Sequence, residues 1–141
     1  MFLDLHKKSH KFLSGIFLIV LLIILDQTVK WYVLHSSTVE VLCNYGIAMG
    51  ISVPKIIFVV LWVGVIFFVV QLWLRSGESD KFITHFSFIL ILSGGISNLI
   101  DRIYYGCVVD YIPLVNISSF NIADVFITFG AILILWTNFR K

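Results

Sequence analysis

Charge is what this sequence has least of. Only 13% of its 141 residues are Asp, Glu, Lys or Arg, 60% are hydrophobic, and the mean hydropathy is +1.03. An ordinary soluble domain is excluded, because its surface needs more polar side chains. The net charge is only +2, and the basic residues lie at the ends of apolar segments, so we expect no nucleic-acid partner. The composition predicts one polytopic integral membrane domain over residues 1–141.

The sequence also has few cysteines, and its histidines form no catalytic or metal-binding motif. Cys43 and Cys107 are too few for a disulfide framework and lack the clustered spacing of a zinc site. We interpret them as small packing residues, and the sequence leaves open whether they pair. The four histidines are scattered, with no HExxH, so we expect neither a metal nor a cofactor. The sequence also has no GxSxG motif, which disfavours a serine hydrolase.

Long apolar runs dominate instead. Four segments approach or exceed the roughly 20 residues that a membrane-spanning helix needs: residues 12–34, 56–74, 82–104 and 121–139. They predict an all-α bundle of four transmembrane helices. The connection 35–54 is rich in Ser, Thr, Val and Gly, so we expect it to form a small strand or hairpin, a β-cradle at the outer membrane interface.

The basic residues indicate how the chain is oriented. Most of them lie before the first segment, between the second and third, and after the fourth: Lys7, Lys8, Lys11, Arg75, Lys81, Arg140 and Lys141. Lys55 and Arg102, at the edges of the second and third segments, weaken this asymmetry only slightly. Because short cytoplasmic loops are enriched in Lys and Arg, we expect both termini to be cytoplasmic. No small-residue cleavage site follows the first run, so we interpret that run as an uncleaved span.

This orientation gathers the polar residues of the apolar segments at the outer face. Ionisable residues within a membrane are costly, and each is by default a functional hypothesis. Asp26 and Lys30 are four residues apart on one helical face and predict an ion pair. Asn98, Asp101 and Arg102 share a face in the same way, so Arg102 can neutralise Asp101. Both groups could equally serve only to hold helices together.

Asp110 and Asp124 differ from these pairs, because neither has a basic residue within one helical turn. Two carboxylates in a desolvated pocket share one proton, so one can act as a general base and the other as a general acid. Such a pair activates water against a peptide carbonyl. Capping of the last helix is the alternative for Asp124, with Ser118 or Ser119 as further caps.

Five motifs in order carry a family resemblance: LDQTVK (25–30), NYGIAMG (44–50), GGISNLIDR (94–102), VVDYI (108–112) and FNIAD (120–124). With four expected spans, the chain resembles the lipoprotein signal peptidases, also called signal peptidase II. The resemblance implies an aspartic endopeptidase in the bacterial cytoplasmic (inner) membrane, with its active site at the periplasmic face. It implies removal of the signal peptide from diacylglyceryl-modified prolipoproteins by cleavage just before the lipidated cysteine.

The resemblance also assigns residues. Its two catalytic aspartates fall on Asp110 and Asp124. Its surrounding motifs fall on Asp26, Lys30, Asn44, Gly46, Ala48, Asn98, Asp101, Arg102 and Asn121. We expect Asn44 and Asn121 to hold the substrate backbone or the oxyanion, Arg102 to act through Asp101, and Gly46 and Ala48 to allow the substrate close approach.

The chain departs from the family pattern at Ser97, where glycine is frequent, and at Met49, where an aromatic residue is frequent. We expect membrane lipids and the prolipoprotein as partners, and a monomer. Two other function classes stay open on the residues alone: an ion-coupled transporter or proton channel, and a non-catalytic membrane partner whose polar residues only hold helices together.

Overall fold

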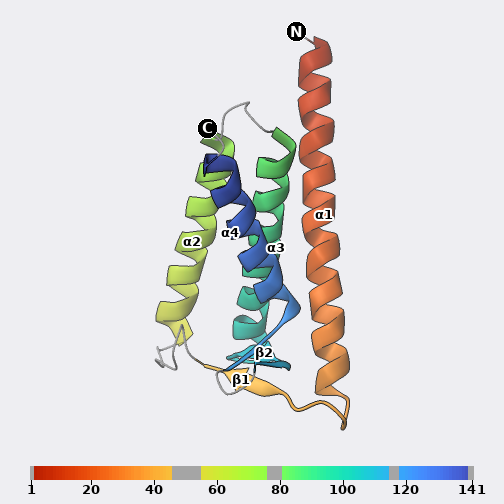
Figure 1. The fold of residues 1–141 in the computed structure, drawn as a ribbon, viewed down its shortest axis with the longest axis vertical. Coiled ribbons are helices and arrows are strands. Elements are labelled where there is room, and N and C mark those ends of the chain that lie inside the picture. The colour runs from red at the N-terminus through yellow and green to blue at the C-terminus, as the bar shows by residue number, and fades with distance from the viewer. Residues whose placement is uncertain (1, 46–54, 76–80, 115–117, 140–141) are drawn as a thin grey trace.

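The computed structural model describes residues 2–45, 55–75, 81–114 and 118–139, and in these ranges the chain is mostly helical (Figure 1). The helices are α1 (Phe2–Leu34), α2 (Lys55–Arg75), α3 (Lys81–Tyr104) and α4 (Ile122–Phe139). Each corresponds to one of the four predicted segments. Helix α1 begins well before residue 12, because the lysine-containing segment ahead of the apolar run is also helical.

Helix α3 is the centre of the bundle. It packs most extensively against α4 and also contacts α1 and α2. The start of α1 and the end of α4 lie at one end of the bundle, and the strands lie at the other, which we call the strand end (Figure 1).

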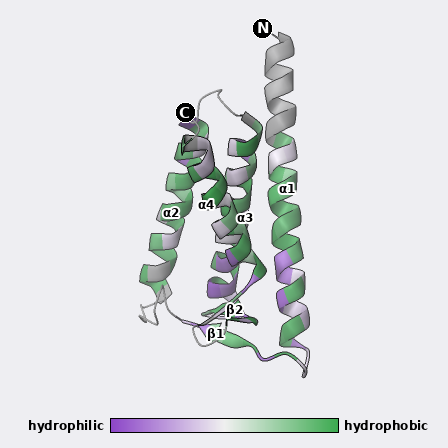
Figure 2. Cartoon of the chain, in the orientation of Figure 1, coloured by the Kyte–Doolittle hydropathy of each residue, from purple (hydrophilic) through white to green (hydrophobic). Residues whose placement is uncertain are grey.

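Apolar side chains cover the outside of the helices. Phe17, Phe67 and Phe129 are each more than half exposed, as on a surface that faces lipid. Among the residues that Figure 2 colours by hydropathy, the strongly hydrophilic ones of α1 and α3 gather near the strands. Within the described residues, 13–34 and 82–104 are long and apolar enough to cross a membrane, whereas 59–75 and 122–137 form shorter apolar helices. The prediction of four spans therefore stays a prediction.

Two glycines let α3 and α4 approach closely. A Cβ atom at Gly94 would collide with the carbonyl oxygen of Ala123, and one at Gly130 would lie 2.7 Å from that of Ser87. Backbones that pack this closely need small residues at the contact. Gly94 thereby fixes the start of α4, and Gly130 fixes its later part.

Short strands close the strand end. Strand β1 (Leu42–Asn44) pairs antiparallel with β2 (Val108–Asp110), and β3 (Ile112–Leu114) pairs antiparallel with β4 (Ser118–Phe120). The strand expected in the first connection is β1. Among the described residues its partner is β2 of the second connection, so the pairing is not a local hairpin.

A disulfide joins Cys43 of β1 to Cys107, which directly precedes β2. The interpretation of these cysteines as small packing residues is wrong for Cys43, which is exposed on its strand, whereas Cys107 is buried in the core at 2% exposure. The two residues are 64 positions apart in sequence, and the pairing of β1 with β2 is what brings them together.

Candidate active site

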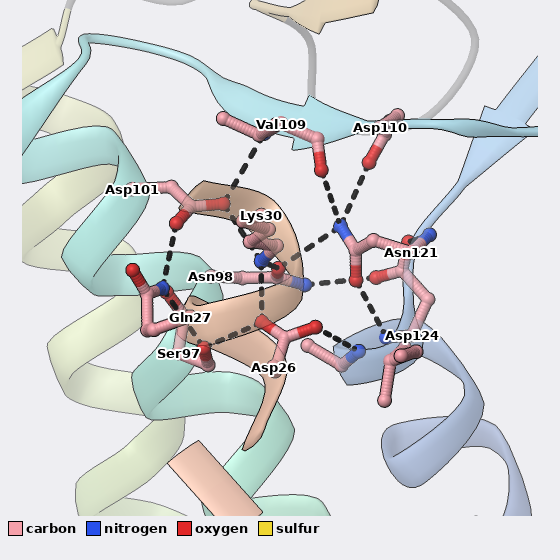
Figure 3. A network of polar contacts seen from close by, with 12 residues as sticks. Asp26, Gln27, Lys30, Ser97, Asn98, Asp101, Val109, Asp110, Asn121 and Asp124 are labelled. Carbon is pink, nitrogen blue, oxygen red and sulfur yellow. Dashed lines mark hydrogen bonds and ion pairs between the residues drawn. The ribbon is translucent and has the colours of Figure 1, made fainter. Parts of the chain in front are cut away.

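A cluster of polar side chains lies at the strand end, with members from α1, α3, α4 and the strands (Figure 3). Most of its members are at most 8% exposed: Asp26, Lys30, Ser97, Asn98, Asp101, Arg102, Asp110 and Asn121. Within the described ranges, every buried side-chain nitrogen or oxygen has a hydrogen-bond partner. This matters because an unpaired polar group away from water is costly.

Lys30 of α1 stands at the centre of the cluster. Its Nζ lies 2.7 Å from a carboxylate oxygen of Asp26 and 2.7 Å from one of Asp101, and it donates to Asn98 Oδ1 at 3.0 Å. An ammonium group has three donors, so all three are used. The predicted pair of Asp26 and Lys30 is confirmed. Asp101 gains a cation from another helix, and the charge of Arg102 acts on it as well.

The carboxylate of Asp26 anchors the start of α4. Its Oδ1 accepts a hydrogen bond from the backbone N–H of Ala123 at 2.9 Å, and its Oδ2 accepts one from Ser97 Oγ at 2.7 Å. The first N–H groups of a helix have no partner within that helix, so a buried carboxylate from α1 satisfies one of them. Helices α1, α3 and α4 are thus joined at one point.

Asp101 fixes strand β2 in a similar way. Its Oδ2 accepts from the backbone N–H of Val109 at 3.2 Å, while its Oδ1 accepts from Gln27 Nε2 at 2.7 Å. The same Gln27 amide donates to Ser97 Oγ and to the Ser97 carbonyl. Strand β2, which ends in Asp110, is therefore held against α3 and α1.

Asn121 caps α4. Its Oδ1 accepts from the backbone N–H of Asp124 at 3.0 Å, and Asp124 Oδ2 accepts from the backbone N–H of Asn121 at 3.3 Å. This reciprocal pair is a capping box, so a capping role for Asp124 is confirmed. The prediction of Ser118 or Ser119 as the cap is wrong, because both lie in β4.

The same Asn121 side chain bridges the two aspartates. Because its oxygen faces Asp124, its Nδ2 points the other way and donates to Asp110 Oδ1 at 2.8 Å. The partners of Asn98 set its orientation in the same way. Lysine can only donate, so the Asn98 oxygen faces Lys30. Its Nδ2 therefore points to Asp124 and donates to Oδ1 at 2.8 Å. Both amides have their orientation set by their partners.

Asp110 is the more buried of the two aspartates, at 2% exposure. Its Oδ2 accepts from Asn44 Nδ2 at 3.0 Å. Burial raises the pKa of Asp110 above its usual 3.8, and the charge of Asp124 adds to this. The hydrogen bonds from Asn44 and Asn121 and the charge of Lys30 oppose it. Its neighbour Tyr111 stays protonated, because burial raises the pKa of that phenol to about 12.

Seven of the eleven predicted site residues are labelled in the cluster of Figure 3. Asn44 joins it through its bond to Asp110, and Arg102 through its charge interaction with Asp110 and Asp101. Gly46 and Ala48 lie outside the described residues.

Sequence reasoning missed Gln27, although it follows Asp26 within LDQTVK. It noted Ser97 only as a departure from the frequent glycine of the family, whereas the hydroxyl of Ser97 joins the network. Across the ranges that the structure describes, no group of three or more His, Cys, Asp or Glu side chains could hold a metal ion.

The arrangement fits acid–base chemistry. One carboxyl group is buried with a raised pKa, a second is half-buried in the first turn of a helix, and Asn121 contacts both. Carboxyl groups in such different environments can divide the roles of acid and base.

Comparisons with known proteins concern the family and the fold of the whole chain. Residues 18–140 match the model of a family described as Signal peptidase (SPase) II. The chain is similar to proteins named lipoprotein signal peptidase from Brucella ovis and Brucella abortus. Each is 32% identical over 150 residues, covering 94% of this chain and 93% of the relative. Two solved structures described as bacterial membrane enzymes share the fold at 24% identity. Their TM-scores are 0.81, over 90% of this chain and 88% of the other, and 0.79, over 91% and 94%.

Proposed function

The chain belongs to the signal peptidase II family, and on this premise we propose an aspartic endopeptidase that removes signal peptides from diacylglyceryl-modified prolipoproteins, just before the lipidated cysteine. Asp110 and Asp124 form its catalytic pair. The observation that carries the proposal is the Asn121 bridge, since this residue caps the helix of Asp124 and donates to Asp110. Asn121 thus holds the Asp110 carboxyl with its side-chain Nδ2 and the Asp124 carboxyl with its backbone N–H. Two carboxyl groups brought together in a desolvated cluster can share a proton.

The two environments suggest which aspartate holds the proton. Asp110 is almost fully buried and its pKa is raised, which favours the protonated acid. Asp124 lies in the first turn of α4, where the helix dipole stabilises negative charge, and Asn98 donates to it. We therefore assign Asp124 as the general base and Asp110 as the general acid.

The proposed reaction balances with these two groups alone. Asp124 takes a proton from water as the water oxygen bonds to the scissile carbonyl carbon, and Asp110 gives its proton to the carbonyl oxygen. The tetrahedral diol then collapses. Asp124 passes its proton to the leaving nitrogen as the C–N bond breaks, and one diol hydroxyl returns a proton to Asp110. The products are a carboxylic acid and an amine, and both aspartates regain their starting states.

The other side chains of the cluster support this pair. Lys30 orients Asn98 toward Asp124, and Asn44 and Asn121 donate to Asp110, so their first role in the proposal is to hold carboxylates. Contact of Asn44 or Asn121 with the substrate backbone or the oxyanion stays a prediction, as does the part played by residues 46 and 48.

We further propose a multi-pass protein of the bacterial cytoplasmic membrane with four spans and the site at the periplasmic face. One integral membrane domain, acting as a monomer, would meet its substrate within the lipid. Support comes from the start of α1 and the end of α4, which both lie at the end of the bundle opposite the strands, and from Arg75, which ends α2 at that same end (Figure 1). A C-terminal reporter that works only in the cytoplasm should be active, and activity of only an export-dependent reporter would contradict this topology.

Cleavage of a diacylglyceryl-modified prolipoprotein by the purified, detergent-solubilised protein tests the function. Asp110→Asn and Asp124→Asn should each lower turnover about 10²-fold to 10⁴-fold, the range for general acid–base groups, at unchanged helix content. Glu40→Gln is the matched control, because Glu40 is an exposed carboxylate in the first connection. Near-normal cleavage by both aspartate variants would refute the pair. An inert wild type on several lipidated substrates would refute the function.

A further inference from the structure

The mechanism above does not use the disulfide between Cys43 and Cys107. Their Cα atoms are 5.5 Å apart, and the bond connects the first interhelical connection to the second. Strand β1 makes its main contact with β2, through a ladder of three residue pairs. Two strands of this length are at best marginally stable without further support. The disulfide is a covalent support at that place.

The disulfide and the catalytic contact lie on opposite faces of the β1–β2 pair. Side chains alternate along a strand, so Asn44 shares a face with Val108 and Asp110, while Cys43 and Cys107 share the other. Asn44 directly follows Cys43 and donates to Asp110 Oδ2 at 3.0 Å. A bond that fixes Cys43 against the start of β2 therefore fixes the Asn44 amide against the end of β2.

The two donors to Asp110 are held by different means. Asn121 is fixed by the cap of α4 and by its bond to Asn98. Asn44 is carried by β1, whose three residues are all exposed. Among the bonds described between β1 and the rest of the chain, the disulfide is the covalent one, so the position of Asn44 depends on it more than the position of Asn121 does.

We propose that the Cys43–Cys107 disulfide is a positioning link for catalysis, which holds Asn44 on Asp110 and makes full turnover depend on the oxidised cysteine pair. This inference rests on the proposed function, because it concerns the proposed catalytic Asp110. The two cysteines touch no reacting atom and act through Asn44.

Formation of the link needs an oxidant of a defined chemical class. The Cys43 and Cys107 thiols lose two electrons and two protons to an external disulfide. The exposed Cys43 thiolate attacks that disulfide, the Cys107 thiolate displaces it, and the oxidant leaves as a dithiol. Protein disulfides with this activity belong to the oxidising side of the membrane, where the proposed topology places the strands. Dithiothreitol reverses the step and becomes a cyclic disulfide.

A pH profile separates a positioning link from a merely structural one. The hydrogen bond from Asn44 favours the charged form of Asp110, so its loss should raise the pKa of Asp110 further. Within the described parts of the chain, the charged groups that act on Asp110 are Asp124 of α4, Lys30 of α1 and Arg102 of α3, and none of these three lies on β1. Breaking the link should therefore move the alkaline limb of the activity profile upward.

The test compares oxidised wild type, reduced wild type, Cys43→Ser/Cys107→Ser, Asn44→Ala and the triple variant, each as purified solubilised protein. The probe is cleavage of a diacylglyceryl-modified prolipoprotein, with kcat/KM measured across pH. Gel shift with a maleimide polymer reports the thiol state. Reduction, the cysteine double variant and Asn44→Ala should each lower kcat/KM about tenfold and should move the alkaline limb equally. Tenfold is the size of one hydrogen bond to the carboxylate that Asp110 becomes as it gives up its proton. Asn44→Ala should add nothing in the cysteine-free protein.

Two further results decide whether the disulfide positions Asn44 for catalysis or only stabilises the fold. Reoxidation with glutathione disulfide should restore wild-type turnover, and dithiothreitol should leave the cysteine-free protein unchanged. Equal kcat/KM and equal pH profiles of oxidised and reduced wild type would overturn the link, while their common activity would still support the proposed function. A lower melting temperature with an unmoved profile would also overturn it, since that result describes a structural staple. An inert oxidised wild type would instead count against the proposed function.

Discussion

The two ends of the bundle treat buried polar side chains differently. At the end opposite the strands, Ser87 and Thr137 are buried, yet each hydroxyl donates to a carbonyl of its own helix, at 2.7 Å and 2.8 Å. At the strand end, Asp26 and Asn98 bond to side chains or backbone of other helices. Burial alone therefore does not identify a functional polar residue. What distinguishes the site is that its bonds cross between elements.

Close packing does not distinguish the two ends. Gly94 near the strands and Gly130 farther from them both bring the backbones of α3 and α4 into contact. Interhelical contact in a membrane depends on such packing and on interhelical hydrogen bonds. The strand end has both among its buried side chains. At the other end the described interhelical hydrogen bond runs from Trp73 Nε1 of α2 to His85 Nδ1 of α3, and His85 is exposed.

The largest effect on this contrast should come from Lys30→Met. This change leaves the carboxylates of Asp26 and Asp101 buried without their shared cation, and breaking a buried pair typically costs about 3–5 kcal/mol. We expect a large fall in melting temperature in detergent and loss of cleavage. Thr28→Val is the control on the same helix, because Thr28 is exposed and donates to its own helix at Ile24. Equal melting temperatures of the two variants would remove the distinction between the ends.

A second comparison uses the glycines. Gly94→Ala and Gly130→Ala should each destabilise by about 1–3 kcal/mol, because both overpack the contact between α3 and α4. Turnover per folded molecule should fall only for Gly94→Ala, whose new methyl group pushes on Ala123, next to Asp124. Gly95→Ala is the matched mild change, since its nearest neighbour, Ile66, lies at 3.8 Å. Melting temperature and turnover of all three variants check this. A matching fall in turnover for Gly130→Ala would show that the two ends are mechanically coupled.

The third prediction concerns pH and the burial of Asp110. Its pKa is raised in the folded protein, so the folded state binds this proton more tightly than the unfolded state does. The associated stability is fully present below the ordinary value of 3.8 and is lost as pH rises through the folded pKa. Activity should fall about tenfold per pH unit above that pKa, because the general acid is then ionised.

Melting curves across pH check the stability part with an isosteric variant. Asp110→Asn cannot ionise, so wild type should lose melting temperature relative to this variant as pH rises. Parallel curves for the two proteins would show that Asp110 does not keep its proton more tightly on folding, and the assignment of Asp110 as the acid would fail.

The difference between bonds within one helix and bonds between elements also explains which contacts the sequence could predict. The pair of Asp26 and Lys30 was predictable, because both lie on one helix with i, i+4 spacing. The second carboxylate on Lys30, Asp101, lies on α3, and no local spacing connects the two. The disulfide was not predicted for the same reason, since it depends on pairing between two separate connections. Local periodicity predicts helices and pairs within them, and packing decides the rest.

The cap of α4 shows how an error of one residue in a predicted helix start hides a contact. The sequence places Asn121 three residues before Asp124, a spacing that fits a capping box. Taking residue 121 as the first helical residue moved the expected cap back to Ser118 or Ser119. The helix begins at Ile122, so an error of one residue at a boundary hid the bridge between the two aspartates.

The smallest predicted effect concerns two serines of α3, one bonded to another helix and one bonded within its own. Ser93 and Ser97 are one helical turn apart on α3, and both are fully buried. Ser93 Oγ donates to Ile89 of its own helix at 2.6 Å, whereas Ser97 Oγ donates to Asp26 of α1 at 2.7 Å. Ser97→Ala should cost about 1 kcal/mol, the typical size of an interhelical hydrogen bond in a membrane protein. Ser93→Ala should cost less than this, because its helix keeps the backbone bond.

Turnover should separate the same two variants. Loss of the Ser97 hydroxyl leaves Oδ2 of Asp26 held by Lys30 alone. Asp26 is the carboxylate that holds the N–H of Ala123 at the start of α4, so the position of Asp124 loosens. We expect a several-fold fall in kcat for Ser97→Ala and none for Ser93→Ala, measured with melting temperatures in one detergent. Equal effects of the two changes would mean that burial, rather than the partner across the helix interface, sets the importance of a polar residue in this bundle.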